Sequence, residues 1–251
     1  MFRALRSLHQ EPVPSPSELS VINRRLEGAP PAEVLQWAVE TYGERLALSA
    51  SFGGPEGMAL LDMLSRITDE VTVLTIDTGF LFKETVEFRE HVMRRYELPL
   101  VVLRPELSVE EQVERYGEEM RTCTPDLCCQ IRKVAPLQKA LERYDSWMTG
   151  IRREQTPQRA NTPIVSWEPR FGAAKIAPFA FVKEEWVHEY VAEHDVPVNP
   201  LLKKGYRSIG CEPCTRPVAA DEDPRAGRWS NLEKTECGLH WAGGQAVRAV
   251  S

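Results

Sequence analysis

Strands and helices alternate along most of this chain, and the alternation constrains its fold more than any other feature. The clearest strand is the run VTVLTI at residues 71–76, whose β-branched side chains suit a strand that is buried on both faces. Further strands are predicted at 45–50, 100–103, 146–150, 164–167 and 175–177, and helices at 17–27, 31–42, 58–67, 85–96, 109–116, 124–143 and 183–194. This order predicts an α/β fold with a mainly parallel twisted sheet and helices on both faces.

A loop of small residues, SFGGPEG at 51–57, joins the first predicted strand to the next helix. Backbone amides in such a loop, together with the helix N-terminus behind it, attract phosphate, although tight turns also need glycine. The segment 77–79 (DTG) follows the strand at 71–76. Ligands of open α/β sheets bind at the carboxyl ends of the strands. The sequence therefore predicts a nucleotide site there.

One domain is predicted at residues 17–241. It comprises a nucleotide-binding core at about 45–195 and an irregular C-terminal tail at about 196–241, where Pro, Gly and charged residues dominate. Residues 1–16 and 242–251 are expected to be disordered.

Charge and hydropathy argue against several classes of protein. The net charge of −6 gives no basis for sequence-independent binding to nucleic acid. No apolar run approaches the roughly 18 residues of a membrane span. The first residues, MFRALRSLHQEPVPSPSE, lack the apolar run of a signal peptide. We therefore expect a cytoplasmic protein that binds neither nucleic acid nor membranes.

The six cysteines are clustered, which is the strongest chemical signal in the sequence. They are Cys123, Cys128, Cys129, Cys211, Cys214 and Cys237. Without a secretion signal they do not indicate disulfides, and the CC and C-x-x-C pairs predict a metal centre. The alternative is buried structural cysteine, which suits Cys123 best.

The CC and C-x-x-C pairs together supply four thiolates, a set that both zinc and iron–sulfur clusters accept. Neighbouring side chains on a helix diverge by about 100°, which favours a cluster with several irons over one zinc ion without deciding between them. The helix at 124–143 is predicted to start at Thr124 as N-cap and to turn Leu127 toward the core. It also places Arg132 and Lys133 one turn beyond the thiols.

Cations and one isolated thiol complete the predicted site. The segment GIRREQTPQR at 150–159 is too polar to bury and lies at a strand end, so an anion site is favoured over a solvated loop. Cys237 stands alone, and Lys234 and His240 are candidates to lower its pKa from about 8.5. An incidental surface cysteine is the alternative.

Five segments together resemble a known family. CCQIRKVAPLQKAL, GIRREQTPQRA, GCEPCTRP, RAGRW and ECGLHW are similar to the signature segments of the assimilatory adenylyl-sulfate reductases. These form the iron–sulfur branch of the adenylyl-sulfate (APS) and phosphoadenylyl-sulfate (PAPS) reductase family. The resemblance runs from about residue 45 to Trp241. Pro55-Glu56-Gly57 departs from it, because the family usually has an acidic pair there.

The resemblance implies an adenine-nucleotide α-hydrolase-like fold and a thioredoxin-dependent reduction of adenylyl sulfate to sulfite and AMP, in sulfate assimilation and cysteine biosynthesis. It implies that Cys237 is the nucleophile and forms an S-sulfonate. It implies one 4Fe–4S cluster on Cys128, Cys129, Cys211 and Cys214. The implied substrate-binding residues are Ser51, Gly53, Asp77, Lys133, Arg152, Arg159, Arg225, Arg228 and His240.

Three alternatives stay open beside this function. The first is the same chemistry on the 3′-phosphorylated substrate, or on both substrates. The second is an ATP-consuming pyrophosphatase of the same fold, disfavoured because the usual S-G-G-x-D-S loop is absent. The third is a non-catalytic, metal-bound adenine-nucleotide sensor. The oligomeric state is open, a homo-oligomer included.

Overall fold

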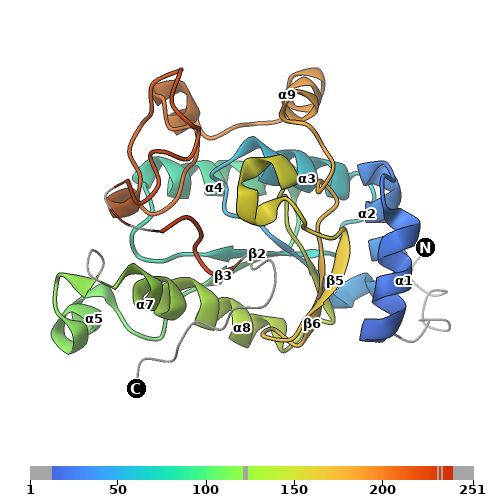
Figure 1. Ribbon diagram of the computed structural model, residues 1–251, viewed down its shortest axis with the longest axis horizontal. Coiled ribbons are helices and arrows are strands. Elements are labelled where there is room, and N and C mark those ends of the chain that lie inside the picture. The colour runs from blue at the N-terminus through green and yellow to red at the C-terminus, as the bar shows by residue number, and fades with distance from the viewer. Residues whose placement is uncertain (1–12, 121–123, 231, 233, 240–251) are drawn as a thin grey trace.

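A six-stranded sheet with helices on both faces forms the centre of the protein in the computed structural model, which describes residues 13–120, 124–230, 232 and 234–239 (Figure 1). The strands are β1 (Leu46–Ser49), β2 (Thr72–Ile76), β3 (Leu100–Leu103), β4 (Ser146–Met148), β5 (Val165–Glu168) and β6 (Ala173–Ile176). Their order in the sheet is β3-β2-β1-β4-β6-β5, and every neighbouring pair is parallel except β5 with β6. The predicted mainly parallel sheet is therefore confirmed.

Alternating side chains of β1 enter two apolar clusters, one on each face of the sheet. Leu46 and Leu48 join the larger cluster, and Ala47 joins the smaller one. The larger cluster is built with α1 (Pro16–Leu26), α2 (Pro31–Tyr42), α3 (Pro55–Ser65), α4 (Lys83–Tyr96) and α9 (Glu184–Glu193). The helix α3 begins three residues earlier than predicted, because Pro55 is tolerated in a first helical turn and Gly54 serves as N-cap.

The second face carries α5 (Val109–Tyr116), α7 (Pro125–Cys129), a π-helix (Gln130–Val134) and α8 (Ala135–Leu141). The prediction of one α-helix over 124–143 was wrong in its middle. Pro136 has no N–H to donate to the carbonyl of Arg132, and its ring would clash with that carbonyl in an α-helix. The backbone widens there, and the Ala135 N–H donates to the Gln130 carbonyl five residues back.

Two details of this helix also differ from the prediction. The Thr124 hydroxyl does not cap α7 but donates to the carbonyl of Met120, at 3.1 Å, in the preceding turn. Leu127 is 38% exposed, whereas Val134 and Leu141 are buried against Trp147. The apolar side chains of this helix therefore face the core only from Val134, the last residue of the π-helix, onward.

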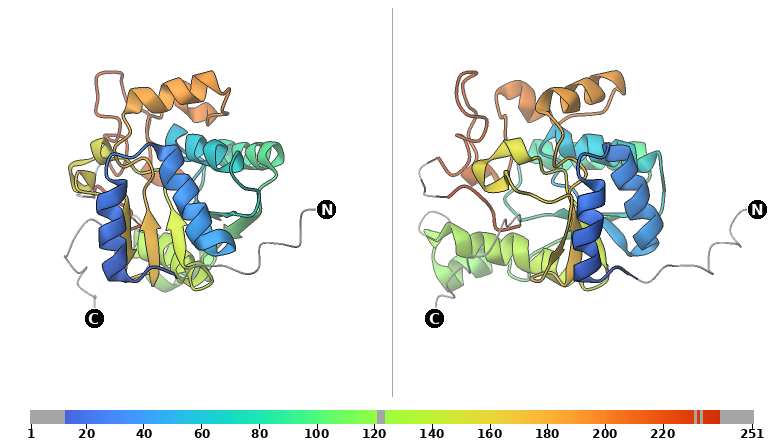
Figure 2. Two further views of the ribbon diagram at one scale, coloured as in Figure 1. Left: turned by 90° about the vertical axis from the view of Figure 1, so that its right-hand side faces the viewer. Right: turned by 45° about the vertical axis from the view of Figure 1, so that its right-hand side comes forward.

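The C-terminal tail has little regular structure, as predicted. Within its described residues it forms two 3-10 turns, Pro200–Lys204 and Glu212–Cys214. It lies on the side of the molecule away from α1 (Figure 2). Isolated bridges join Leu81 to Cys211 and Thr215 to Arg228, so the C-x-x-C segment is tied to the chain beyond β2. Among the described helices, none has the length and apolarity to cross a membrane.

A buried carboxylate ties three helices together. Asp62 of α3 accepts hydrogen bonds from Tyr96 of α4 (2.9 Å), Tyr190 of α9 (2.7 Å) and Arg66 (2.8 Å). Burial alone would raise the pKa of Asp62, but these hydrogen bonds outweigh it and hold the pKa below its usual value. Asp62→Ala is expected to lower the free energy of unfolding by about 3 kcal/mol at pH 7, because two tyrosine hydroxyls lose their acceptor.

This loss should depend on pH. A depressed carboxyl pKa stabilises the fold above the unfolded-state value of about 4, and the contribution is lost as pH falls through the folded-state pKa. Urea unfolding at pH 7 and near pH 3 should show the difference between wild type and variant shrinking in acid. The exposed Asp69→Ala serves as control; an equal loss in both variants would contradict the account.

Candidate active site

A cleft of about 500 Å³ opens at the carboxyl ends of β1, β2 and β4, where Ala50, Ile76 and Gly150 line it. The tail closes one side, so the two halves of the predicted domain share this cleft. Seven of the predicted catalytic and substrate-binding residues line it, and so does Cys211 of the predicted metal centre; the seven are Ser51, Lys133, Arg152, Arg159, Arg225, Arg228 and Cys237. The structure thus brings together residues that are far apart in the sequence.

Three other predicted substrate residues are placed differently. Gly53 is buried under the tail, where an added Cβ would lie 3.0 Å from the Ile209 carbonyl oxygen. The Asp77 carboxylate lies 4.0 Å from Arg89 Nη1 and 3.8 Å from Arg104 Nη2, and it accepts a hydrogen bond from the Gly79 N–H. His240 lies outside the described residues, as does Cys123.

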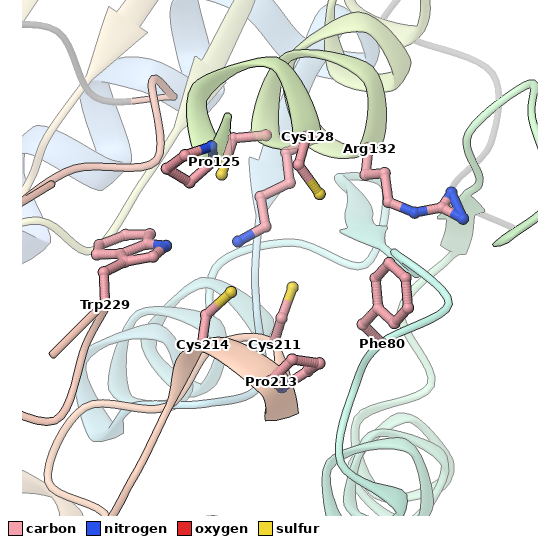
Figure 3. A pocket seen from close by; sticks show the side chains of 10 residues that line it. Phe80, Pro125, Cys128, Arg132, Cys211, Pro213, Cys214 and Trp229 are labelled. Carbon is pink, nitrogen blue, oxygen red and sulfur yellow. The ribbon is translucent and has the colours of Figure 1, made fainter. Parts of the chain in front are cut away.

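A smaller cavity beside the cleft is lined by all four cysteines of the predicted metal centre. Cys128 and Cys129 come from α7, and Cys211 and Cys214 come from the tail. The sulfur of Cys128 points across the cavity toward those of Cys211 and Cys214 (Figure 3). Within the described ranges, no three His, Cys, Asp or Glu side chains converge closely enough to hold a single metal ion. The thiols surround a space instead of meeting at one point.

Burial disfavours the ionised form of these thiols. It raises the pKa of Cys128 and Cys214, and it raises the pKa of Cys129 to about 12. Polar groups also approach the sulfurs: the Thr78 hydroxyl lies 3.3 Å from Cys211 Sγ, and Gln112 donates to Cys128 Sγ at 3.9 Å. Thiolates would therefore need compensating positive charge in this cavity.

Arg132 and Lys133 supply cationic groups to the cavity wall. Arg132 is 2% exposed, with its guanidinium 4.9 Å from the Phe80 ring centroid, and its buried Nε has no hydrogen-bond partner among the described residues. Lys133 lines both the cysteine cavity and the cleft. Burial alone would lower the pKa of Lys133, but the negative charges of the ionised Cys211, Cys237 and Cys129 outweigh burial and raise it.

Two of the three arginines of the segment 150–159, Arg152 and Arg159, are buried, so the prediction that this segment is too polar to bury was wrong at these two positions. Carboxylates make the burial tolerable. Arg152 Nε lies 3.1 Å from Glu56, and its Nη2 lies 3.1 Å from Glu184. Arg159 donates from Nε and Nη2 to the two carboxylate oxygens of Glu236, both at 2.8 Å.

Arg225 and Arg228 bring two further cations from the tail. Arg225 donates to the Thr235 carbonyl at 2.8 Å, and burial lowers its pKa. The Arg228 guanidinium lies 4.5 Å from the centroid of the Trp229 ring, a cation–π arrangement. Gly210 leaves room for it, because an added Cβ would collide with that guanidinium.

Cys237 is half-buried and lines the cleft together with Lys133, Arg225 and Arg228. The lone thiol therefore lies in a cleft that is also lined by cationic side chains. Among the residues at this site that were not predicted are Glu236, which pairs with Arg159, and Trp229, which lines both cavities. The sequence did contain a signal for Glu236: it is an acidic residue directly before the lone thiol, in a site that is otherwise predicted to be cationic.

The fold and the cleft define an α/β protein in which a thiol and several cationic side chains line one cleft at the carboxyl ends of the strands. Residues 45–217 match the phosphoadenosine phosphosulfate reductase domain. An adenosine 5'-phosphosulfate reductase of Halalkalibacterium halodurans is 47% identical over 88% of this chain and 96% of its own length. A phosphoadenosine 5'-phosphosulfate reductase of Gloeobacter violaceus is 43% identical over 88% of this chain and 93% of its own.

The comparison with solved structures leads to the same family. The phosphoadenylyl-sulfate reductase of Candida auris, in a phosphate complex, superposes with a TM-score of 0.70 at 31% identity, over 81% of this chain and 98% of its own. The FMN adenylyltransferase of Candida glabrata, at 15% identity, has a TM-score of 0.53 over 84% of this chain and 70% of its own, and shares the fold alone. The chain belongs to the phosphoadenosine phosphosulfate reductase family, which confirms the resemblance and the adenine-nucleotide α-hydrolase-like fold.

Proposed function

We propose that this protein reduces adenylyl sulfate to sulfite and AMP, with Cys237 as nucleophile and reduced thioredoxin as electron donor. The observation that carries the proposal is the position of Cys237 in the same cleft as Lys133, Arg225 and Arg228. A thiol among cations at the carboxyl ends of parallel strands suits attack on an anionic, nucleotide-bound sulfur. The reaction belongs to sulfate assimilation in the cytoplasm, on the way to cysteine.

In the first step the Cys237 thiolate attacks the sulfur of the phosphosulfate, and the bond from sulfur to the phosphate oxygen breaks. AMP leaves with that electron pair, and Cys237 carries an S-sulfonate. An anionic nucleophile and an anionic substrate repel each other, so the step needs cations. Lys133, Arg225 and Arg228 line the same cleft as the thiol and would supply this positive charge, and Arg152 and Arg159 line the cleft as well.

In the second step a thiolate of reduced thioredoxin attacks the sulfur of Cys237, and sulfite leaves. A second thioredoxin thiol then attacks the mixed disulfide, so that Cys237 is a thiol again and thioredoxin carries a disulfide. Both electrons come from the two thioredoxin thiols.

The cysteine cavity is proposed to hold a 4Fe–4S cluster. Four thiols on the wall of one cavity supply the number and kind of ligands that such a cluster takes. Arg132, whose Nε has no hydrogen-bond partner in the described part of the chain, and the neighbouring Lys133 offer positive charge to such an anionic group. When bound, the cluster would add an electrostatic field at Lys133, on the wall that the cavity shares with the cleft.

The unphosphorylated nucleotide is the proposed substrate, because the chain has all four cluster cysteines and several curated relatives carry the name adenosine 5'-phosphosulfate reductase. A sulfite-release assay with thioredoxin and each of the two nucleotides tests this choice. Turnover with adenylyl sulfate is expected to exceed turnover with the 3′-phosphorylated form. A preference for the 3′-phosphorylated form would reverse the assignment, and no sulfite from either would refute the function.

Gly210→Ala is expected to weaken nucleotide affinity by about tenfold, because the new methyl group displaces the Arg228 guanidinium from its place over Trp229. Titration of AMP by calorimetry measures the change. Gly57→Ala is the matched control: Gly57 lines the same cleft, and an added Cβ there meets no atom within 4 Å. Equal AMP affinities in the two variants would show that Arg228 does not contribute to nucleotide binding.

A further inference from the structure

The segment 234–239, here called the thiol strap, is anchored on both sides of Cys237. Before the thiol, Lys234 pairs with Asp126 of α7, and the Thr235 carbonyl accepts a hydrogen bond from Arg225. After the thiol, Arg170 donates to the Gly238 carbonyl at 3.1 Å, and Leu239 packs against the apolar cluster of Val134 and Trp147. The strap therefore crosses from the tail to the second face of the sheet with Cys237 near its middle.

Glu236 makes the densest of these contacts. Its two carboxylate oxygens accept from Nε and Nη2 of Arg159 at 2.8 Å each, a bidentate pair. The Thr156 hydroxyl donates to it at 3.3 Å, and Arg225 Nη2 lies 3.6 Å away. The side chains of Glu236 and Arg159 are 13% and 9% exposed, so solvent screens the pair little.

On the Arg159 side, this ion pair is held in place by further hydrogen bonds. Arg159 ends a short 3-10 turn, Pro157–Arg159, and its third nitrogen, Nη1, donates to Gln155 Oε1. Gln155 in turn donates from Nε2 to Glu56 at 2.8 Å, and Glu56 is held by Arg152. A network from α3 through this turn therefore fixes the guanidinium that receives Glu236.

We propose that Glu236 is a positioning residue, whose pairing with Arg159 holds Cys237 at the reacting sulfur of the nucleotide. This inference rests on the proposed function. Arg159 uses all three guanidinium nitrogens in these contacts, so its role is to fix the strap, and contact with the phosphosulfate falls to Lys133 and Arg228. Holding a nucleophile in one place removes the entropic cost of bringing it to the substrate, which raises the rate of the chemical step without raising affinity.

The test compares Glu236→Gln with Glu222→Gln in otherwise intact, anaerobically prepared protein. Glu222 is the matched control, because it pairs with Arg216 in the same tail at 2.9 Å but in solvent. The first readout is the alkylation rate of Cys237 by iodoacetamide without nucleotide, followed by peptide mass spectrometry. Glu236→Gln is expected to react about tenfold faster than wild type, and Glu222→Gln at the wild-type rate.

The second readout is single-turnover formation of the Cys237 S-sulfonate from adenylyl sulfate. Glu236→Gln should lower the saturating rate by at least about tenfold while the half-saturating concentration stays within about twofold. The double variant Glu236→Gln with Arg159→Gln should be no slower than the slower single variant, because both remove one interaction. If Glu236→Gln does not fold, Glu236→Asp, which keeps the charge with a shorter reach, should show a smaller change in the same direction.

Two results would overturn the proposal: wild-type values in both readouts, or a raised half-saturating concentration with an unchanged saturating rate. A double variant whose loss of saturating rate equals the product of the two single-variant losses would contradict the pairing of Glu236 with Arg159. The alkylation readout requires no turnover. If no variant, wild type included, forms sulfite, the proposed function fails, while faster alkylation of Glu236→Gln alone would still show that Glu236 fixes the strap.

Discussion

Replacing Cys237 with serine is expected to abolish sulfite formation while the protein still folds and binds AMP. A hydroxyl is a far weaker nucleophile than a thiolate at neutral pH, and a serine sulfate ester has oxygen in place of the Cys237 sulfur that thioredoxin attacks. Removal of a nucleophile typically costs on the order of 10⁴-fold or more in rate. The measurement is sulfite release with thioredoxin present.

The same Cys237→Ser protein provides its own controls, because AMP affinity and metal content should match those of wild type. Sulfite release within about tenfold of wild type would exclude Cys237 as the nucleophile. Unchanged cellular function with Cys237→Ser would favour the nucleotide-sensor alternative.

Replacing Cys211 with alanine is expected to remove the proposed cluster. Cys211 is buried, lines the cavity together with Cys128, Cys129 and Cys214, and bridges to Leu81. Loss of one of four thiolate ligands leaves an iron site open to solvent and hydrolysis. Anaerobically purified wild type should be brown and hold about four irons per chain, and Cys211→Ala should be colourless with little iron.

Iron analysis and visible absorbance measure this outcome, and Cys237→Ser is the control, since that thiol lines the cleft and not the cysteine cavity. One zinc and no iron in the wild-type protein would reject the cluster. Wild-type iron in Cys211→Ala would reject Cys211 as a ligand.

Local patterns were sufficient to predict most of the sheet. The β-branched run of β2 falls where the sequence placed it, because a buried parallel strand needs continuous apolar side chains. The apolar run of β3 was also placed correctly, although this edge strand leaves Val101 42% exposed. The π-helix was missed because periodicity was weighed without Pro136, whose missing N–H sets the wider turn.

The candidate site was less predictable where partners come from distant segments. Arg159 was read as too polar to bury, because its partner Glu236 lies 77 residues away along the chain. Asp77 was assigned to the nucleotide from its position after β2, yet Arg89 and Arg104 approach its carboxylate. Cysteine spacing alone predicted the thiol cavity, since four thiols with neighbouring cations have few other uses.

The most direct measurement is the intact mass of the protein after incubation with adenylyl sulfate in the absence of thioredoxin. The account predicts that one SO₃ group is added per chain, that peptide mapping places it on Cys237, and that reduced thioredoxin removes it as sulfite. An unmodified Cys237 after AMP has been released, or an adduct on another residue, would contradict the account.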